Sequence, residues 1–469
     1  MWLIIHLLIV VAASVRALLR PHRDPASRIA WILFIVALPY IGALTYLMLG
    51  EVRVTRVPTG HGSPESAWQL ASDLATGNAA VPDNTLPGFS TGTAISGFKP
   101  TAGNTGRLLD DSNATIDALV ADIDAASEHV HLLFYIWLAD TNGCKVVQAM
   151  VRAAQRGVTC RVIVDDLGSR NFIHSRHWEA MKQAGVRLAR AQAIGNIALR
   201  ILTGRVDVRN HRKVVVIDNR ITYCGSQNCA DPEFAVKAKY APWVDAVIRF
   251  EGPIARQNQL LFLEDWLIYT QEDCRELAKL PVPPATQGFV AQVIGTGPRN
   301  HYSAIPELFV TLMFSARKEL VITTPYYVPN DAMQAALCAA ARRGIATTII
   351  FPARNDSWIV GAASRSYYSE LLDAGVNIHE YEGGLLHTKS LTVDGEITLI
   401  GSANMDRRSF DLNFENNILF QDAQLTQSVR RRQNDYLAQS RQVSHVDVAT
   451  WGFRYQLRNN LMAILSPIL

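Results

Sequence analysis

Two stretches of this chain, HRKVVVIDNRITYCGSQN at 211–228 and HTKSLTVDGEITLIGSAN at 387–404, follow one pattern. Each begins with a histidine, has a lysine two residues later and an aspartate five residues beyond the lysine, and ends in Gly-Ser-x-Asn. Six fixed residues coincide by chance at roughly one position in 10^8 when each residue type has a frequency of about 5%. The sequence therefore predicts an internal duplication in which each half supplies the same chemical groups.

The sequence around these motifs repeats in the same order. The segment AAQRGVTCRVIV (153–164) aligns with AARRGIATTIIF (340–351). In both halves, short apolar runs typical of buried strands alternate with segments of helical spacing that end at Gly157 or Gly344. Such alternation favours an α/β fold, with a mixed sheet flanked by helices in each half. Two homologous halves are expected to pack about a pseudo-two-fold axis.

Composition divides the chain into four segments. The region that follows the first fifty residues is rich in glycine, proline, serine and threonine, which is typical of a tether with some irregular structure. A proline-rich stretch, LAKLPVPPATQG, separates the two halves at 277–288. We expect a helical hairpin at 1–50, a linker at 51–106, a first half at 107–276, and a second half with a C-terminal tail at 289–469.

The predicted hairpin consists of two long apolar runs, Trp2–Leu19 and Ile29–Leu49. At 1.5 Å per residue, a helix of about 20 residues crosses a hydrocarbon core of about 30 Å. A secretory signal peptide would have one shorter apolar region followed by a cleavage site, so the sequence predicts a membrane anchor of two transmembrane helices. Arginines occur both in the connector and after the second run, so the side of the membrane that carries the rest of the chain stays open.

Net charge and cysteine usage exclude other classes of protein. A formal net charge of +3 over 469 residues does not indicate a nucleic-acid partner. The six cysteines are scattered and form no C-x-x-C pair, so we interpret them as buried thiols. His129 and His131 share a strand face, but no carboxylate or cysteine lies near them in the sequence, and packing is their expected role. No metal or other cofactor is expected.

The two motifs contain the groups that phosphodiester chemistry requires. Residues two apart on a strand share a face, so the histidine and lysine of each motif point the same way. A glycine turn then returns the serine and asparagine to the same place. Two lysines and two asparagines can hold the anionic oxygens of a phosphoryl group without a metal. The candidate site residues are His211, Lys213, Asp218, Ser226 and Asn228, and His387, Lys389, Asp394, Ser402 and Asn404.

The two histidines suit a reaction in two steps. One neutral imidazole can attack phosphorus and form a phosphohistidine, while the other, protonated, donates a proton to the departing alcohol and later accepts one from the incoming hydroxyl. Because the motifs are alike, the residues alone do not assign the two roles. The strands DAVIRF (245–250) and ENNILF (415–420) follow the motifs at matching places, so Asp245 and Glu415 are candidates to orient the imidazoles. Ordinary charges at strand ends are the alternative.

This pair of motifs resembles the signature of the phospholipase D superfamily. The resemblance implies that His211 is the nucleophile, that His387 is the acid and base, and that Asp218 and Asp394 support the site structurally. It extends over nearly the whole chain, because a two-helix N-terminal anchor and several further phrases are similar to those of bacterial cardiolipin synthases. These phrases are FYIW (134–137), RNHRK (209–213), ITTPYYVP (322–329), GSANMDRRSFDLNFE (401–415) and LSPIL (465–469).

The resemblance implies a reaction, its lipid partners and a location. One phosphatidylglycerol donates its phosphatidyl group to the enzyme and releases glycerol, and a second phosphatidylglycerol accepts the group to give cardiolipin. The enzyme is expected to be a multi-pass protein of the bacterial inner membrane, in contact with phosphatidylglycerol and other anionic lipids. The alternatives are a phospholipase D-type hydrolase, a phosphatidyltransferase that uses phosphatidylethanolamine, and a membrane scaffold with degenerate sites. The oligomeric state is open.

Two further segments bear on the lipid substrate. Between Arg187 and Lys213 there are seven basic residues and one acid, Asp207, interleaved with apolar residues. This segment either lies against anionic headgroups or forms a solvated loop with a buried apolar side. The apolar and aromatic C-terminal stretch, Trp451–Leu469, is expected to pack on its own domain.

Overall fold

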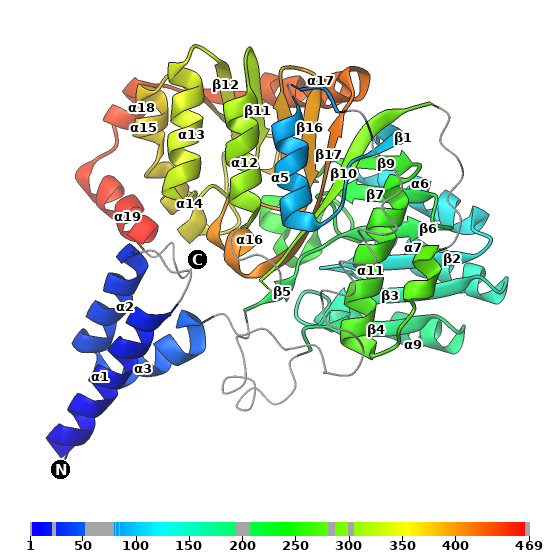
Figure 1. Ribbon diagram of the computed structural model, residues 1–469, viewed down its shortest axis with the longest axis horizontal. Helices are drawn as coiled ribbons and strands as arrows, with labels where there is room; N and C mark the ends of the chain where they lie inside the picture. Colours follow the sequence, from blue (N-terminus) through cyan, green and yellow to red (C-terminus); the bar gives the residue numbers. More distant parts are fainter. Residues whose placement is uncertain are drawn as a thin grey trace.

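The computed structural model describes residues 2–20, 25–51, 79, 81–83, 85–193, 207–279, 287–298 and 304–464. Two α/β halves share one large mixed sheet flanked by helices, and a small group of N-terminal helices projects from one side (Figure 1). Residues 194–206 of the basic segment between Arg187 and Lys213 and the final stretch 465–469 lie outside the described residues.

The first half is a mixed sheet with the strand order β1-β9-β7-β6-β2-β3-β4. β2, β3 and β4 are parallel, and the other neighbours are antiparallel. Every residue of β2 and of β6 is buried, which agrees with their near-continuous apolar sequences. The strands are β1 (Thr101–Leu108), β2 (His129–Phe134), β3 (Thr159–Asp165), β4 (Arg187–Ala191), β6 (Val214–Ile217), β7 (Ile221–Gly225) and β9 (Val247–Glu251).

The second half repeats this order strand for strand as β10-β17-β16-β15-β11-β12-β13, with β18 added at the edge. β1 and β10 pair antiparallel and join the two sheets, so the strand orders of the two halves run outward from one central pair. The predicted duplication and pseudo-two-fold α/β fold are confirmed. The strands are β10 (Phe289–Thr296), β11 (Glu319–Thr323), β12 (Ala346–Pro352), β13 (Asn377–Tyr381), β15 (Ser390–Val393), β16 (Ile397–Gly401), β17 (Asn413–Gln421) and β18 (Ser440–Val443).

The helices of the two halves also correspond. In each half the helix after the second strand begins at a polar cap, because Asp140 and Asn330 accept the backbone N–H groups of Gly143 and Met333. The helices of the first half are α6 (Ser112–Ala125), α7 (Thr141–Gln155), α8 (Arg170–Ile173), α9 (Arg176–Gln183), η2 (Ala235–Tyr240), α11 (Ile254–Thr270) and η3 (Arg275–Lys279). Those of the second are α12 (Ala304–Ser315), α13 (Asp331–Arg342), α14 (Trp358–Arg365), α15 (Tyr368–Asp373), α16 (Arg407–Asp411), α17 (Ala423–Ala438), α18 (His445–Ala449) and α19 (Phe453–Ile464).

Part of the segment 51–106 differs from the expected irregular linker. Helix α5 (Leu86–Ser96) buries Phe89 and Ile95 in the core of the second half, and β1 joins the central sheet from Thr101 onward. The sequence does not predict this helix, because glycines weaken the helical pattern. Gly88 and Gly92 occur here because they lie against Leu312 and Gln292, with no room for a side chain. The chain therefore crosses to the second half before the first half begins.

The N-terminal helices are α1 (Trp2–Leu19), α2 (Pro25–Ala37), α3 (Pro39–Thr45) and η1 (Tyr46–Gly50). The second apolar run was expected to form one helix, but it breaks before Pro39 because proline disfavours the α conformation in the residue that precedes it. A small core of Ala17, Trp31, Ile35 and Tyr46 holds the helices together. Arg16 also forms an ion pair with the buried Glu51.

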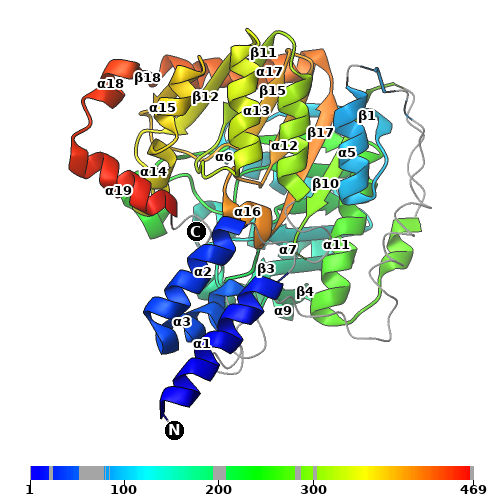
Figure 2. The ribbon, with the colours of Figure 1, turned by 60° about the vertical axis from the view of Figure 1, so that its left-hand side comes forward.

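None of the helices in the described ranges combines the length and the apolar character needed to cross a bilayer. Most of the large apolar side chains that are exposed nevertheless lie in the N-terminal helices, and the largest group outside them lies on α19. In Figure 1 and in Figure 2, which is turned by 60°, α1, α2 and α3 project away from the body of the protein.

Candidate active site

Each motif histidine is held by backbone of the other half. The short strand β5 (Arg209–Asn210) leaves the first half and pairs with the start of β17, so the His211 N–H donates to the Phe414 carbonyl at 2.9 Å. The equivalent strand β14 (Leu385–Leu386) pairs with β8 (Trp243–Val244), and the His387 N–H donates to the Val244 carbonyl at 2.9 Å. The two histidines therefore meet where the halves cross.

The carboxylates predicted to orient the imidazoles are exchanged between the halves. The Nδ1 of His211 lies 2.9 Å from Oε2 of Glu415, and the Nδ1 of His387 lies 2.7 Å from Oδ1 of Asp245. A carboxylate can only accept, so Nδ1 carries the proton in each ring and Nε2 keeps its lone pair. Each imidazole thus depends on a residue from the opposite half.

The motif serines do not lie where the sequence placed them. They were predicted to bind phosphate, but the Ser226 hydroxyl donates to Asp245 at 2.6 Å and the Ser402 hydroxyl donates to Glu415. Both oxygens also accept a backbone N–H, at 3.2 Å from Ala246 and at 2.9 Å from Asn416. Because each hydroxyl proton is already engaged behind the carboxylate, these serines extend the histidine–carboxylate pairs instead of facing a phosphate.

Both motif lysines are buried, and the hydrogen bond that each makes to a histidine carbonyl uses one of its three ammonium protons. The Nζ of Lys213 donates to the His211 carbonyl at 3.0 Å, and the Nζ of Lys389 donates to the His387 carbonyl at 2.7 Å. Burial lowers the pKa of Lys213 to about 8 and that of Lys389 to about 7, against the pull of Glu415 and Asp245. Both ammonium groups would regain a full charge on contact with an anion.

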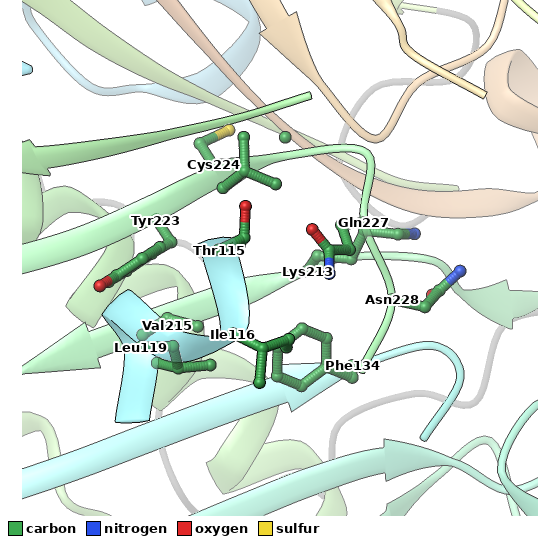
Figure 3. A pocket seen from close by; sticks show the side chains of 12 residues that line it. Thr115, Ile116, Leu119, Phe134, Lys213, Val215, Tyr223, Cys224, Gln227 and Asn228 are labelled. Carbon is green, nitrogen blue, oxygen red and sulfur yellow. The ribbon is translucent and has the colours of Figure 1, made fainter. Parts of the chain in front are cut away.

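Apolar side chains lie behind Lys213, and they explain why its ammonium group is poorly solvated. A small cavity of ≈ 20 Å³ lies on this side. Figure 3 shows Ile116, Leu119 and Phe134 among the residues that line it. Lys213 and Asn228 border the same cavity. The ammonium therefore has an apolar wall behind it, and an anion in the active site would provide the solvation that water cannot.

Both histidines line one cavity of ≈ 380 Å³ between the halves. The motif asparagines, Asn228 and Asn404, line it as well, and Oδ1 of Asn404 has no hydrogen-bond partner among the described residues. Burial lowers the pKa of His211 and of His387 to about 4, although the carboxylate on each ring opposes the shift. Both imidazoles are therefore neutral at pH 7, and either could attack an electrophile.

The motif aspartates lie away from this cavity, at the far ends of β6 and β15. Asp218 accepts the backbone N–H groups of Ser127, Glu128 and His129 at 2.8–2.9 Å, and Asp394 accepts those of residues 317–319 in the same way. Both have positive φ, 50° and 53°, at the start of the β-turn after the strand. The structural role implied by the resemblance remains a proposal, and this geometry supports it.

We expect Asp394→Ala to lower the free energy of unfolding by about 1–3 kcal/mol, because three backbone donors lose their acceptor. The pH dependence of turnover should not change. Thermal denaturation beside a pH–rate profile checks both points, with Asp373→Ala, on an exposed side chain, as the control. A shifted pH profile at unchanged stability would instead give Asp394 a chemical role.

Several cavity residues were missed by sequence reasoning. Tyr135 lies edge-on to the His211 ring at 4.9 Å, and Trp243 packs on His387 at 4.6 Å. Asp406 and Arg408 line the cavity on the second half only, where the first half has Ala230 and Pro232 at the matching motif positions. The phrases that contain Tyr135, Asp406 and Arg408 stood out only by resemblance, since lone aromatic and charged residues carry no spacing signal.

The rim of the cavity contains an ion pair that joins the halves. Lys237 of η2 contacts Asp356, which precedes α14, and the Tyr326 hydroxyl donates to the same carboxylate at 2.6 Å. A second contact between the halves is a hydrogen bond at 3.0 Å from the Arg408 guanidinium to the Asp207 carbonyl. The cavity is therefore symmetric at its centre and asymmetric at its edges.

Comparisons with known proteins agree with this geometry. A family model described as the cardiolipin synthase PLD-like domain matches twice, at residues 119–246 and 309–436. A second model, described as the phospholipase D-nuclease N-terminal segment, matches residues 2–51. The crystal structure of phosphatidylserine synthase from Haemophilus influenzae Rd KW20 is similar in fold, with a TM-score of 0.59 and 15% identity over 78% of this chain and 95% of that one.

Curated relatives match over the full length of the chain. Cardiolipin synthase A of Edwardsiella ictaluri is 36% identical, and that of Pectobacterium carotovorum subsp. carotovorum is 35% identical. Both alignments cover 100% of this chain and 98% of the relative. Because the relatives match from end to end and the domain model matches both halves, the chain belongs to the cardiolipin synthase family of phospholipase D-like proteins.

Proposed function

We propose that this chain is a cardiolipin synthase that transfers the phosphatidyl group of one phosphatidylglycerol to another and releases glycerol. The observation that carries the proposal is the pair of crossed histidine–carboxylate contacts, His211 with Glu415 and His387 with Asp245, on a single cavity. Two imidazoles that share one cavity can act on opposite sides of one phosphorus atom. The full-length likeness to cardiolipin synthases supplies the substrate class.

In the first step, the lone pair on Nε2 of His211 attacks phosphorus, and the bond from phosphorus to the glycerol oxygen breaks. His387, protonated on Nε2 in the enzyme–substrate complex, gives that proton to the departing oxygen. The bound phosphodiester favours this protonation by adding negative charge beside the ring. Glu415 stabilises the positive charge that His211 acquires.

In the second step, the hydroxyl of the incoming phosphatidylglycerol gives its proton to His387 and attacks phosphorus, and the phosphohistidine bond breaks. Lys213 and Lys389 balance the charge on the non-bridging oxygens throughout, together with the amides of Asn228 and Asn404. The centre of the site is symmetric, so the choice of His211 as nucleophile rests on the resemblance to the superfamily. No step requires a metal.

The pKa values of the lysines predict how activity depends on pH. His387 must be protonated and has a pKa of about 4, so kcat/KM for phosphatidylglycerol should fall steadily as pH rises above that value. A lysine is cationic below its pKa, so the fall should become steeper above about pH 7, when Lys389 loses its proton, and steeper again above about pH 8 with Lys213. Lys389→Arg keeps the charge at any of these pH values, so the change of slope near pH 7 should disappear. A profile between pH 6 and 9 tests this, and a Lys389→Arg profile identical to that of the wild type would contradict it.

Product analysis tests the proposed reaction. The purified full-length enzyme, incubated with vesicles of phosphatidylglycerol alone, should form cardiolipin and glycerol in equal amounts. Phosphatidic acid as the main product would make the protein a hydrolase, and a need for phosphatidylethanolamine would make it a different phosphatidyltransferase. Full activity in His211→Ala would show that the activity does not come from this site, which would revive the scaffold alternative.

As a member of this family the chain is a membrane-associated enzyme, and its finer placement is a proposal. We propose that the exposed apolar side chains of residues 4–47 anchor it in the bacterial inner membrane, in contact with phosphatidylglycerol and other anionic lipids. The prediction that this segment crosses the bilayer twice stays a prediction. Extraction of isolated membranes at high pH would separate an inserted segment, which stays with the lipid, from a peripheral one.

A further inference from the structure

The last described helix, α19, has its large apolar side chains on the outer face, which is unusual for a helix that faces water. Its apolar side chains Phe453, Leu457, Leu461 and Ile464 are exposed, with Phe453 at 77% and Ile464 at 68%, whereas Asn459 is only 1% exposed. At 100° per residue the four apolar side chains fall within an arc of roughly 80°, nearly opposite Asn459. A surface helix of a soluble domain normally has its apolar face inward.

The side of α19 that faces the body contains the half-buried Tyr455 and Met462 and the buried Asn459. A cavity of ≈ 200 Å³ lies beneath it, and its lining includes Arg365, Ser366, Ser369 and Asn459. The Nδ2 of Asn459 has no hydrogen-bond partner among the described residues. Packing on the body of the protein therefore does not explain the four exposed apolar side chains, and the expectation that this stretch would simply pack on its own domain accounts for only part of its surface.

Charges beside the apolar stripe indicate what covers it. Arg454 and Arg458 are exposed along one flank of the stripe, and Arg458 stacks over the Tyr455 ring at 4.4 Å. Basic side chains next to an exposed apolar stripe are typical of helices that lie in the plane of a membrane with anionic headgroups. If this side of α19 faced water instead, the four apolar side chains would stay exposed to solvent.

The position of α19 agrees with a membrane as its partner. In Figures 1 and 2, α19 lies on the side of the body from which the N-terminal helices project. It packs against α14, whose first residue, Trp358, is 63% exposed. Ser357 and Val360, on either side of Trp358, line the catalytic cavity. One side of the protein therefore combines the apolar N-terminal helices, the α19 stripe and an edge of the cavity.

We propose that α19 docks on the surface of an anionic phospholipid bilayer. Phe453, Leu457, Leu461 and Ile464 enter the acyl region, and Arg454 and Arg458 lie among the phosphates. The helix fixes the orientation of the body on the membrane, so that lipid headgroups reach the catalytic cavity while their acyl chains stay in the bilayer. This contact does not depend on which reaction the site performs.

Photocrosslinking in the full-length protein tests the proposal. The variant Leu457→p-benzoylphenylalanine, bound to vesicles that contain radiolabelled phosphatidylglycerol, should crosslink to lipid at least about tenfold more than Phe314→p-benzoylphenylalanine. Phe314 is a suitable control because it is an equally exposed apolar residue at the end of α12. Similar lipid yields at the two positions, or a crosslink from position 457 to the N-terminal helices or to a second copy of the chain, would overturn the proposal.

A kinetic measurement gives an independent readout. The double variant Leu457→Glu, Leu461→Glu should raise KM for phosphatidylglycerol in vesicles at least about tenfold, because it places charge in the acyl region. The same variant should retain the wild-type KM for a short-chain phosphatidylglycerol dissolved as monomers, which shows that the fold and the site are intact. Equal effects on both substrates, or no effect on either, would contradict the docking role.

Discussion

Replacement of His211 by alanine is expected to abolish cardiolipin formation, and replacement of His387 is expected to do the same. Each change removes a group that acts directly on phosphorus or on the alcohol oxygen, so we expect losses of at least about 10^4-fold in kcat. His174→Ala, on an exposed histidine of the first half, should retain full activity. Quantitative cardiolipin assays of the purified variants check these values.

The two inactive variants should differ when the leaving group needs no acid. With a phosphatidyl ester of p-nitrophenol, the phenolate departs without protonation, so His387→Ala should release one equivalent of nitrophenol and retain a phosphatidyl group on His211. His211→Ala should give neither the burst nor the adduct. Peptide mapping of the adduct assigns the nucleophile, and an adduct on His387 would reverse the two roles.

The second large effect is expected at the carboxylates. Glu415→Gln should lower kcat about 10²- to 10⁴-fold, because a neutral amide neither stabilises the imidazolium nor fixes the ring with its proton on Nδ1. Asp245→Asn should cause a loss of the same order. Ser226→Ala, which removes one hydrogen bond to Asp245, should cost about tenfold or less.

The crossed arrangement predicts which step each carboxylate affects. With the p-nitrophenyl ester, Glu415→Gln should slow the burst, since Glu415 contacts the nucleophile His211 across the two halves. Asp245→Asn should leave the burst nearly unchanged and slow the later transfer to phosphatidylglycerol, since Asp245 contacts His387. Rapid-quench measurement of both phases tests this. The reverse pattern, with the adduct still on His211, would mean that each carboxylate acts on the histidine of its own half.

The repeated motif was sufficient to predict the duplicated α/β fold, because the strand that follows each His-x-Lys and the glycine that ends the hairpin are local features. It also identified Asp245 and Glu415 as equivalent. It did not predict their exchange, which depends on Arg209 and Asn210 leaving their own sheet to pair with β17. Two residues in a long-range parallel pairing leave no periodicity in the sequence.

The serines show a second limit of the pattern. Ser226 and Ser402 occupy equivalent positions beside the asparagines that line the cavity, and spacing alone could not tell which side chain turns inward. The turn sends the hydroxyls back toward Asp245, which lies just before β9, and toward Glu415 of β17, and these carboxylates accept their hydrogen bonds.

At the ends of the chain, composition was a weaker guide than packing. Apolar content predicted two uninterrupted helices near the N-terminus, but a single proline, Pro39, divides the second one. At α19 the apolar residues were recognised, but not the side that they occupy. That side depends on which face meets α14 and the polar cavity beneath it, and this follows only from tertiary contacts.

The central claim is that the two histidines act on one phosphorus atom, and a structure of the enzyme with vanadate tests it most directly. Vanadate adopts the five-coordinate geometry of a phosphoryl group in transfer. We predict one vanadium atom bonded to Nε2 of one motif histidine, with Nε2 of the other in contact with the opposite apical oxygen and both lysines on the equatorial oxygens. Two separate vanadate ions, each at one histidine with no shared contact, would contradict the account.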